Sequence, residues 1–232
     1  AGKLPAAIRH FRKALKVSPD YAKPHYNLGL CLLTQDKQKL AEKAFRQAVL
    51  FDPDHAKAWR KLGAIREEAG FSVEAMAAFR QFLRLFPKDG EVRERLAALY
   101  ESANRSQEAL AVLLEGTHSS LGADGLFRGG RISYALGRFE QAESWLLRCL
   151  EQDDFNWQAW HALGDARVGM KNFPGAVEAY ERALEIQPDH PPTFNNLANC
   201  RTFLCDWSTR EDDISAIETF LKEEALQVGV FE

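Results

Sequence analysis

The residues that could bind a metal or act as nucleophiles are scattered along the 232-residue chain. The four cysteines, Cys31, Cys149, Cys200 and Cys205, include no CxxC pair, and the six histidines do not cluster in the sequence. Disulfide frameworks and zinc sites need closer spacing. We therefore expect reduced, structural thiols, no metal, no cofactor and no catalytic residue, in a reducing compartment that is most simply the cytoplasm.

Nothing in the sequence is typical of an enzyme, a nucleic-acid-binding protein or a membrane protein. No glycine-rich stretch continues into the Gly-Lys-Ser/Thr of a phosphate loop, and no strand–turn–helix pattern of a nucleotide-binding fold occurs. A net charge of −3 argues against nucleic-acid binding and against a polybasic membrane patch. No apolar run reaches the ~18 residues of a membrane span, and residues 1–10 lack the apolar core of a signal peptide. We therefore expect partners that are proteins or peptides.

Small and apolar residues recur with a period of 34 residues. One series comprises Ala7, Ala41, Ala75, Ala109, Ala142 and Ala176. A second comprises Gly29, Gly63, Ala97, Gly130, Gly164 and Ala198. A third comprises Phe11, Phe45, Phe79, Leu113, Leu146 and Tyr180. Each series shortens once to 33 in the same part of the chain, so the sequence is built of repeats.

The apolar pattern within each repeat predicts two helices. In residues 56–89, apolar side chains recur at helical spacing on one face of each half. Gly70 is expected to end the first helix, and Pro87 the second. We expect the small side chains of Gly63 and Ala75 to face each other, which would let the two helices approach closely.

This pattern resembles the tetratricopeptide repeat, which carries Trp, Leu-Gly, Tyr, Ala, Phe, Ala and Pro at fixed positions of a helix pair. The fullest match comprises Trp160, Leu163, Gly164, Ala176, Tyr180, Ala183 and Pro188. The resemblance implies an all-α fold, a right-handed α-solenoid of helix hairpins. We expect half a repeat at 4–17, full repeats at 22–55, 56–89, 90–122, 123–156 and 157–190, and the first helix of a sixth at 191–204.

Two segments depart from the regular solenoid. Residues 1–204 are expected to form it, and residues 205–232 a capping or linker helix on its last repeat. The segment Gly116–Gly125 lacks the terminal proline, and Gly129 and Gly130 follow inside a helix, where each costs ~1 kcal/mol relative to alanine. We predict an irregular superhelix pitch there, which is interpreted either as a tolerated weak repeat or as a hinge.

In the family, the first helices of the repeats line a concave groove that binds extended peptide segments. The resemblance implies that this groove is lined by Lys23, Asn27, Lys57, Arg60, Lys61, Arg95, Arg128, Arg131, Tyr134, His161, Asn195, Asn196 and Asn199. Asparagines at the sixth position of a repeat can bind peptide backbone. Other residue types interrupt that series between Asn27 and Asn196, so backbone clamping along the whole groove is not expected.

The basic residues of the groove allow two interpretations. Lys23, Lys57, Arg60 and Lys61, continued by Arg95 and Arg128, could hold acidic side chains or a C-terminal carboxylate. Alternatively, nearby glutamates balance them on a solvated helix face, which is the simpler interpretation. Some family members clamp the terminal carboxylates of chaperone tails, and Asn27, Lys57 and Lys61 match three positions of that clamp. A free-standing adaptor for acidic peptide tails is therefore the alternative function.

The end of the sequence resembles a second, more specific family. Asn196-Leu197-Ala198-Asn199-Cys200 followed by Cys205-Asp206-Trp207-Ser208 is similar to the junction between repeats and catalytic region in the O-linked N-acetylglucosamine transferase family. The resemblance implies that the chain is the non-catalytic, substrate-presenting arm of a glycosyltransferase. Alternatively, Trp207 caps the end of a solenoid. At the other end, Ile8, Phe11 and Leu15 are expected to be exposed, which would allow a homo-oligomer.

Overall fold

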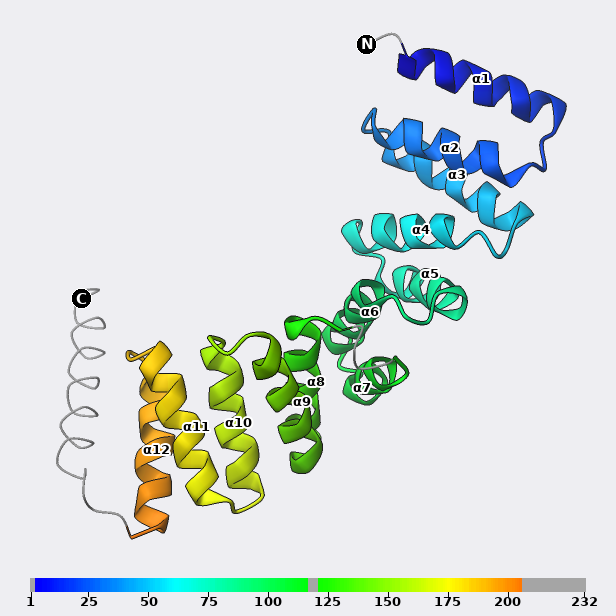
Figure 1. Cartoon of the computed structure of the whole chain (residues 1–232). Coiled ribbons are helices and arrows are strands. Elements are labelled where there is room, and N and C mark those ends of the chain that lie inside the picture. Colours follow the sequence, from blue (N-terminus) through cyan, green and yellow to red (C-terminus); the bar gives the residue numbers. More distant parts are fainter. Residues whose placement is uncertain (1–2, 117–120, 206–232) are drawn as a thin grey trace, which may run out of the picture. The chain divides into compact units, whose positions relative to one another are not determined.

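The structure, a computed structural model, describes residues 3–116 and 121–205. These residues form twelve α-helices and no strand (Figure 1), so the predicted all-α class is confirmed. The helices are α1 (Lys3–Val17), α2 (Ala22–Leu33), α3 (Gln38–Phe51), α4 (Ala56–Glu68), α5 (Ser72–Leu85), α6 (Gly90–Ser102), α7 (Ser106–Leu114), α8 (Ala123–Ala135), α9 (Phe139–Gln152), α10 (Trp157–Gly169), α11 (Phe173–Ile186) and α12 (Pro191–Phe203). None of these helices is long and apolar enough to cross a membrane. The capping helix predicted for 205–232 lies outside the described residues, except for Cys205.

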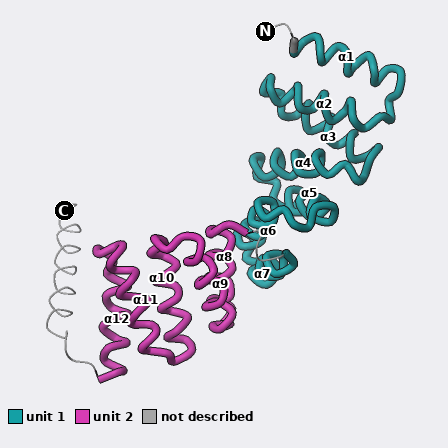
Figure 2. The backbone as a smooth tube through the Cα atoms, viewed as in Figure 1, with its two compact units in different colours: residues 1–120 teal, residues 121–232 magenta. Residues whose placement is uncertain are grey.

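The chain divides into two compact units, residues 1–120 and 121–232 (Figure 2). In unit 1, α2 and α3, α4 and α5, and α6 and α7 pack as hairpins, and α1 packs on α2. In unit 2, α8 and α9, and α10 and α11, form hairpins, and α12 packs on α11. The boundary falls inside the irregular segment Gly116–Gly125. The pitch of the superhelix and the division at residue 204 remain predictions.

A residue with positive φ follows the first helix of each of these hairpins. The residues are Asp36, Gly70, Asn104, Gly137 and Lys171 in the hairpins, and Cys205 after α12. At Gly70 (φ 77°) glycine suits this backbone because it lacks a Cβ. The next amide, of Phe71, donates to the carbonyl of Arg66 at 2.8 Å and closes the helix end. The predicted end of the first helix at Gly70 is confirmed.

In four of the five hairpins a glycine of the first helix lies against a large side chain of the second. The pairs are Gly29 with Phe45, Gly63 with Phe79, Gly130 with Leu146, and Gly164 with Tyr180. A methyl group on Gly63 would lie 2.3 Å from the Phe79 ring. The ring of Phe79 therefore fills the space beside Gly63, while the prediction that Gly63 faces Ala75 stays a prediction.

The fourth hairpin, α8 with α9, has a further glycine in its first helix, Gly129, whose presence is explained by Trp145. In three of the other four hairpins this pair of positions holds a leucine in the first helix and an alanine in the second, as in Leu62 with Ala78. Here Gly129 faces Trp145, and a methyl group on the glycine would lie 2.8 Å from the indole. Trp145 is only 2% exposed. The large and the small side chain have exchanged places across the hairpin, so Gly129 makes room for the indole.

In the second, third and fifth hairpins, the fourth residue of the first helix donates a hydrogen bond to the preceding turn. Trp59 and Trp160 donate their indole N–H to the carbonyl oxygen six residues earlier, at 2.8 and 2.9 Å. Arg93 occupies this position in the third hairpin and donates to the carbonyls of Pro87 and, at 2.6 Å, Val112. Arg93 is 1% exposed, and its Nε has no hydrogen-bond partner. Unit 1 therefore buries a cation where other hairpins hold an indole.

The N-terminal helix is less exposed than the sequence suggests. Ile8 is buried, and Phe11 and Leu15 are half-buried. The expectation that all three are exposed is wrong for Ile8, because α1 packs on α2. Self-association through this end of the chain remains a prediction, which sedimentation velocity at several concentrations tests.

Candidate functional site

The first helices of unit 1 carry arginines that are already paired. Arg60 of α4 donates to Glu91 of α6, and its Nη1 lies 3.5 Å from an oxygen of Asp89. In the opposite direction, Arg95 of α6 donates through Nε to Glu67 of α4 at 2.9 Å. The hydrogen bond from Arg60 lowers the pKa of the Glu91 carboxyl. These two arginines therefore join neighbouring helices, as the balanced-face interpretation predicts.

The lysines predicted for the same groove are differently placed. Lys23 on α2 and Lys57 and Lys61 on α4 are exposed. Within the described ranges, none of them forms an ion pair or hydrogen bond. Asn27, on α2, is half-buried. The positive charge available to a partner on unit 1 therefore comes from the lysines rather than from Arg60 and Arg95.

Unit 2 has a pocket of about 500 Å³ on its first helices. It is lined by Tyr134 of α8, Asp165 and Val168 of α10, Phe173 and Tyr180 of α11, and Asn196, Asn199, Cys200 and Phe203 of α12. The structure thus brings three predicted site residues, Tyr134, Asn196 and Asn199, into one pocket. Asn199 is exposed and presents a donor and an acceptor to the pocket.

Asp165 organises the polar side of this pocket. Its Oδ1 accepts hydrogen bonds from the Tyr180 hydroxyl at 2.7 Å and from Asn196 Nδ2 at 3.1 Å. Its Oδ2 lies 3.4 Å from His161 Nε2. Burial and the negative charge of Asp165 together raise the pKa of Tyr134 and that of Cys200. The carboxylate therefore orders the helix junction and gives the pocket a negative potential.

The predicted residue His161 lies beside the pocket, in a second network between α10 and α12. His161 Nδ1 and His190 Nδ1 lie 2.8 and 2.6 Å from the hydroxyl oxygen of Thr193, which is fully buried. A hydroxyl can donate to one imidazole and accept from the other. Burial, and then the neighbouring His161, lowers the pKa of His190. The junction therefore favours the neutral form of His190.

The remaining predicted residues do not line this pocket. Arg128 is half-buried, and the guanidinium of Arg131 lies 5.9 Å from the centre of the Phe127 ring; both arginines belong to α8. Asn195 is exposed on α12. Arg95 and Arg128, which the sequence suggests as parts of one basic stripe, belong to different units.

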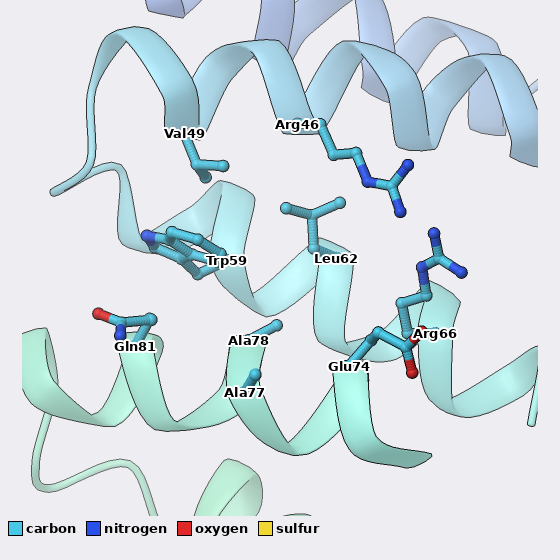
Figure 3. A pocket seen from close by; sticks show the side chains of 9 residues that line it. All are labelled: Arg46, Val49, Trp59, Leu62, Arg66, Glu74, Ala77, Ala78 and Gln81. Carbon is cyan, nitrogen blue, oxygen red and sulfur yellow. The ribbon is translucent and has the colours of Figure 1, made fainter. Parts of the chain in front are cut away.

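A further pocket, of about 430 Å³, lies in unit 1 between α3, α4 and α5 (Figure 3). Trp59 and Leu62 point into it, while Arg46 and Arg66 lie at one end. Both guanidinium groups pair with Glu42, that of Arg46 at 2.8 Å. No residue predicted for the groove lines this pocket, and its cations are held within the chain.

Metal-binding and thiol chemistry find little support in the described part of the chain. No cluster of three or more His, Cys, Asp or Glu side chains able to hold a metal ion occurs there. All four cysteines are free. Burial, and then the charges of Asp153 and Asp124, raises the pKa of Cys149 to about 11, so this thiol stays protonated near neutral pH.

Sequence reasoning missed part of the unit 2 pocket. Phe173 and Phe203 stack with ring centres 4.8 Å apart, although they lie thirty residues apart in the sequence. Phe203 has the thirteenth position of its repeat, which the family places in the groove, but it was not among the predicted residues, and Phe173 has no such position. Phe203 is 69% exposed, and its contact with Phe173 depends on how α12 packs on α11.

Comparison with known families identifies the repeat. Models described as tetratricopeptide repeat match residues 22–55, 56–99 and 157–190, and a model described as TPR repeat matches residues 1–36. The chain is a tetratricopeptide repeat protein. The hairpins, their turns and their glycine-to-ring contacts are therefore those of tetratricopeptide repeats.

Curated relatives of this tetratricopeptide repeat protein match short segments. Protein FlbA of Caulobacter vibrioides (strain ATCC 19089 / CIP 103742 / CB 15) is 37% identical over 59 residues, 25% of this chain and 10% of FlbA. Tetratricopeptide repeat-containing protein trd-1 of Caenorhabditis elegans is 33% identical over 61 residues, 26% of this chain and 8% of trd-1. The aligned segments thus span about a tenth of each relative.

Solved structures share the fold over a larger part of the chain. YrrB, described as a TPR protein with an unusual peptide-binding site, has a TM-score of 0.65 at 22% identity, covering 80% of this chain and 96% of YrrB. MamA from Desulfovibrio magneticus RS-1 has a TM-score of 0.60 at 17% identity, covering 72% and 96% of the two chains. The predicted solenoid of tetratricopeptide hairpins is confirmed.

Proposed function

We propose that this chain is a protein-interaction scaffold that holds an extended segment of a partner along its first helices, with the unit 2 pocket as an anchoring site. The tetratricopeptide fold supports an interaction role. The observation that carries the proposal is the pocket itself, where Asn199 lies among exposed aromatic side chains. Amide groups can bind peptide backbone while the apolar lining takes one side chain.

Selection of peptides from a random display library tests this proposal. We expect selected peptides to bind the wild-type chain and to lose most of their affinity on Phe203→Asp or Asn199→Ala. Phe155→Asp is the matched control, because Phe155 is 75% exposed in unit 2, similar to Phe203 at 69%, and does not line the pocket. Equal losses for Phe203→Asp and Phe155→Asp, or no loss for either pocket variant, would contradict the proposal.

A second candidate function uses unit 1 and accounts for its free lysines. Lys57 and Lys61 lie one helical turn apart on α4, exposed, and Asn27 lies on α2. We propose that they attract acidic segments or a terminal carboxylate, as in a free-standing adaptor for acidic tails. Charge-assisted hydrogen bonds from lysine to carboxylate would supply the affinity.

For the whole protein, we propose the non-catalytic arm of a glycosyltransferase similar to the O-linked N-acetylglucosamine transferase family, in the cytoplasm. The support is the sequence resemblance around Asn196–Ser208, of which residues 206–208 lie outside the described part, and the free thiols. Determining the coding sequence beyond Glu232 tests it. Two nucleotide-sugar-binding α/β lobes are expected, and a stop codon would overturn the proposal.

A further inference from the structure

The unit 2 pocket combines apolar walls with a single carboxylate. Among the described residues, its lining contains three aromatic side chains besides Tyr180 and includes no lysine or arginine. Asp165 is the one acidic residue of this described lining, with 24% of its side chain exposed. A pocket of this composition disfavours an acidic ligand and leaves a cation as the complementary charge.

One oxygen of this carboxylate keeps acceptor capacity. Both short hydrogen bonds, from Tyr180 and Asn196, end on Oδ1 of Asp165. Oδ2 has His161 Nε2 at 3.4 Å, which is long for a hydrogen bond. A carboxylate offers about four lone-pair sites. An incoming N–H donor can therefore bind Oδ2 without displacing the bonds that hold α10, α11 and α12 together.

The field of Asp165 reaches the surrounding groups of the pocket. Its charge contributes, after burial, to raising the pKa of Tyr134 on α8 and of Cys200 on α12. The same charge adds to burial and the hydrogen bond in raising the pKa of Tyr180 on α11. Burial is the larger cause in each case, and the charge of Asp165 further disfavours the anionic forms of groups on three helices.

The aromatic lining suits the stem of a long basic side chain. Phe203 stacks on Phe173 at 4.8 Å with an interplanar angle of 11°, and Phe203 is 69% exposed. Tyr134 is 41% exposed. Lysine and arginine place their methylene groups on such apolar surfaces, and an aromatic face attracts their charge.

We propose that this pocket binds a lysine or arginine side chain of the partner segment, with its stem on the aromatic lining and its charge on Asp165. The inference rests on the proposed function and adds the identity of the anchoring side chain. It assigns unit 2 a preference opposite to that of the unit 1 lysines.

Two small probes of matched shape test the inference. N-acetyl-arginine amide and N-acetyl-citrulline amide differ in charge but have nearly the same size, and their binding is followed by NMR shifts of the Asn199 and Asn196 side-chain amides. We expect the arginine probe to bind about fivefold more tightly, as for a partly exposed charge pair. In Asp165→Asn the ratio should fall to about one, because the amide still accepts from Tyr180 but carries no charge.

Glu178→Gln is the matched control, since Glu178 is exposed on α11 outside the pocket. This variant should keep the preference for arginine. Equal binding of both probes by the wild-type chain, or a preference that survives in Asp165→Asn, would overturn the inference. If Asp165→Asn fails to fold, the salt dependence of binding to the wild-type chain tests the inference instead. Only the affinity for the arginine probe should fall as the salt concentration rises, and an equal salt dependence of both probes would overturn the inference.

The two proposals can fail separately. If library peptides require Phe203 but the two probes bind equally, the pocket anchors partners without selecting a cation. If library peptides do not require Phe203 or Asn199, the anchoring function itself fails. A probe preference without peptide binding would leave a cation pocket that does not anchor a segment, which also contradicts the inference as stated.

Discussion

The two units join their first helices by different chemistry. In unit 1, α4 and α6 are joined by arginine–carboxylate pairs, with Arg60 36% and Arg95 31% exposed in their side chains. In unit 2, α10 and α12 are joined by hydrogen bonds around Asp165 and the buried Thr193. The fifth and sixth repeat positions thus hold ion-paired arginines in unit 1 and, in unit 2, members of the hydrogen-bond networks around Asp165 and Thr193. Unit 1 should respond more to salt, and unit 2 more to acid.

The cores of the two units also depart from the repeat in different ways. Unit 1 buries the guanidinium of Arg93 where other hairpins hold an indole, while unit 2 buries Trp145 against Gly129. A departure from the consensus is therefore compensated locally in each unit. Two backbone carbonyls accept hydrogen bonds from the terminal nitrogens of the arginine, and a missing side chain makes space for the tryptophan.

The largest effect is expected in the core of unit 2. Trp145→Ala should destabilise by about 3–5 kcal/mol because it leaves a cavity, and Gly129→Leu by about 1–3 kcal/mol because it overpacks the hairpin. The double variant, which restores the leucine and alanine of the other hairpins, should cost less than the sum. Urea denaturation measures this coupling, and strict additivity of the two changes would show that the side chains do not compensate each other.

In unit 1, removal of the buried cation should have a smaller effect. Arg93→Ala is expected to cost about 1–3 kcal/mol, because it leaves the carbonyls of Pro87 and Val112 without their donor. Arg9→Ala, at an exposed arginine of α1, is the control and should change stability by less than about 0.5 kcal/mol. Thermal unfolding of both variants makes the comparison; a change at Arg93 no larger than at Arg9 would show that its bonds do not stabilise the unit.

The free lysines of unit 1 predict a salt-dependent affinity for acidic peptides. Lys57→Glu combined with Lys61→Glu should weaken binding of a short Glu-rich peptide with a free carboxyl terminus by about tenfold at low salt, without loss of helix content. The same reversal of charge, from lysine to glutamate, at Lys39 and Lys43, which are exposed on α3, is the control. Fluorescence anisotropy measures the binding, and an unchanged affinity would contradict the second candidate function.

The smallest effect is the pH dependence of unit 2. Because the pKa of His190 is lower in the folded chain than its ordinary value of about 6.5, the unfolded chain binds more protons between the two values. Stability contributed by neutral His190 is therefore present above about pH 6.5 and is lost as the pH falls through the folded-state pKa. Hydrogen exchange of α10 and α12 should report this loss, and His190→Gln should reduce it.

His10→Gln serves as the control for that measurement, since His10 is exposed on α1 in unit 1. It should leave the acid response of α10 and α12 unchanged. A response that survives in His190→Gln would place its origin elsewhere in unit 2.

Much of the fold could be predicted because helix hairpins are encoded locally. Gly70 ends a helix through its own backbone freedom. The periodic apolar residues place each helix face at the correct spacing. The contact of Gly63 with the ring of Phe79 was not predicted, because it depends on how the second helix packs across the hairpin. The same holds for the placement of Ile8, which depends on how α1 packs on α2.

The sequence by itself determined that the chain folds as tetratricopeptide hairpins, and it placed Tyr134, Asn196 and Asn199 among groove residues through their repeat positions. Only the tertiary structure decided that Arg60 and Arg95 are neutralised while nearby lysines are not, and that Asp165 is the centre of a pocket. The physical reason is the distance along the sequence between the residues that interact. Helix formation depends on neighbours within about one turn, whereas ion pairs and pockets join side chains some thirty residues apart, whose meeting depends on packing.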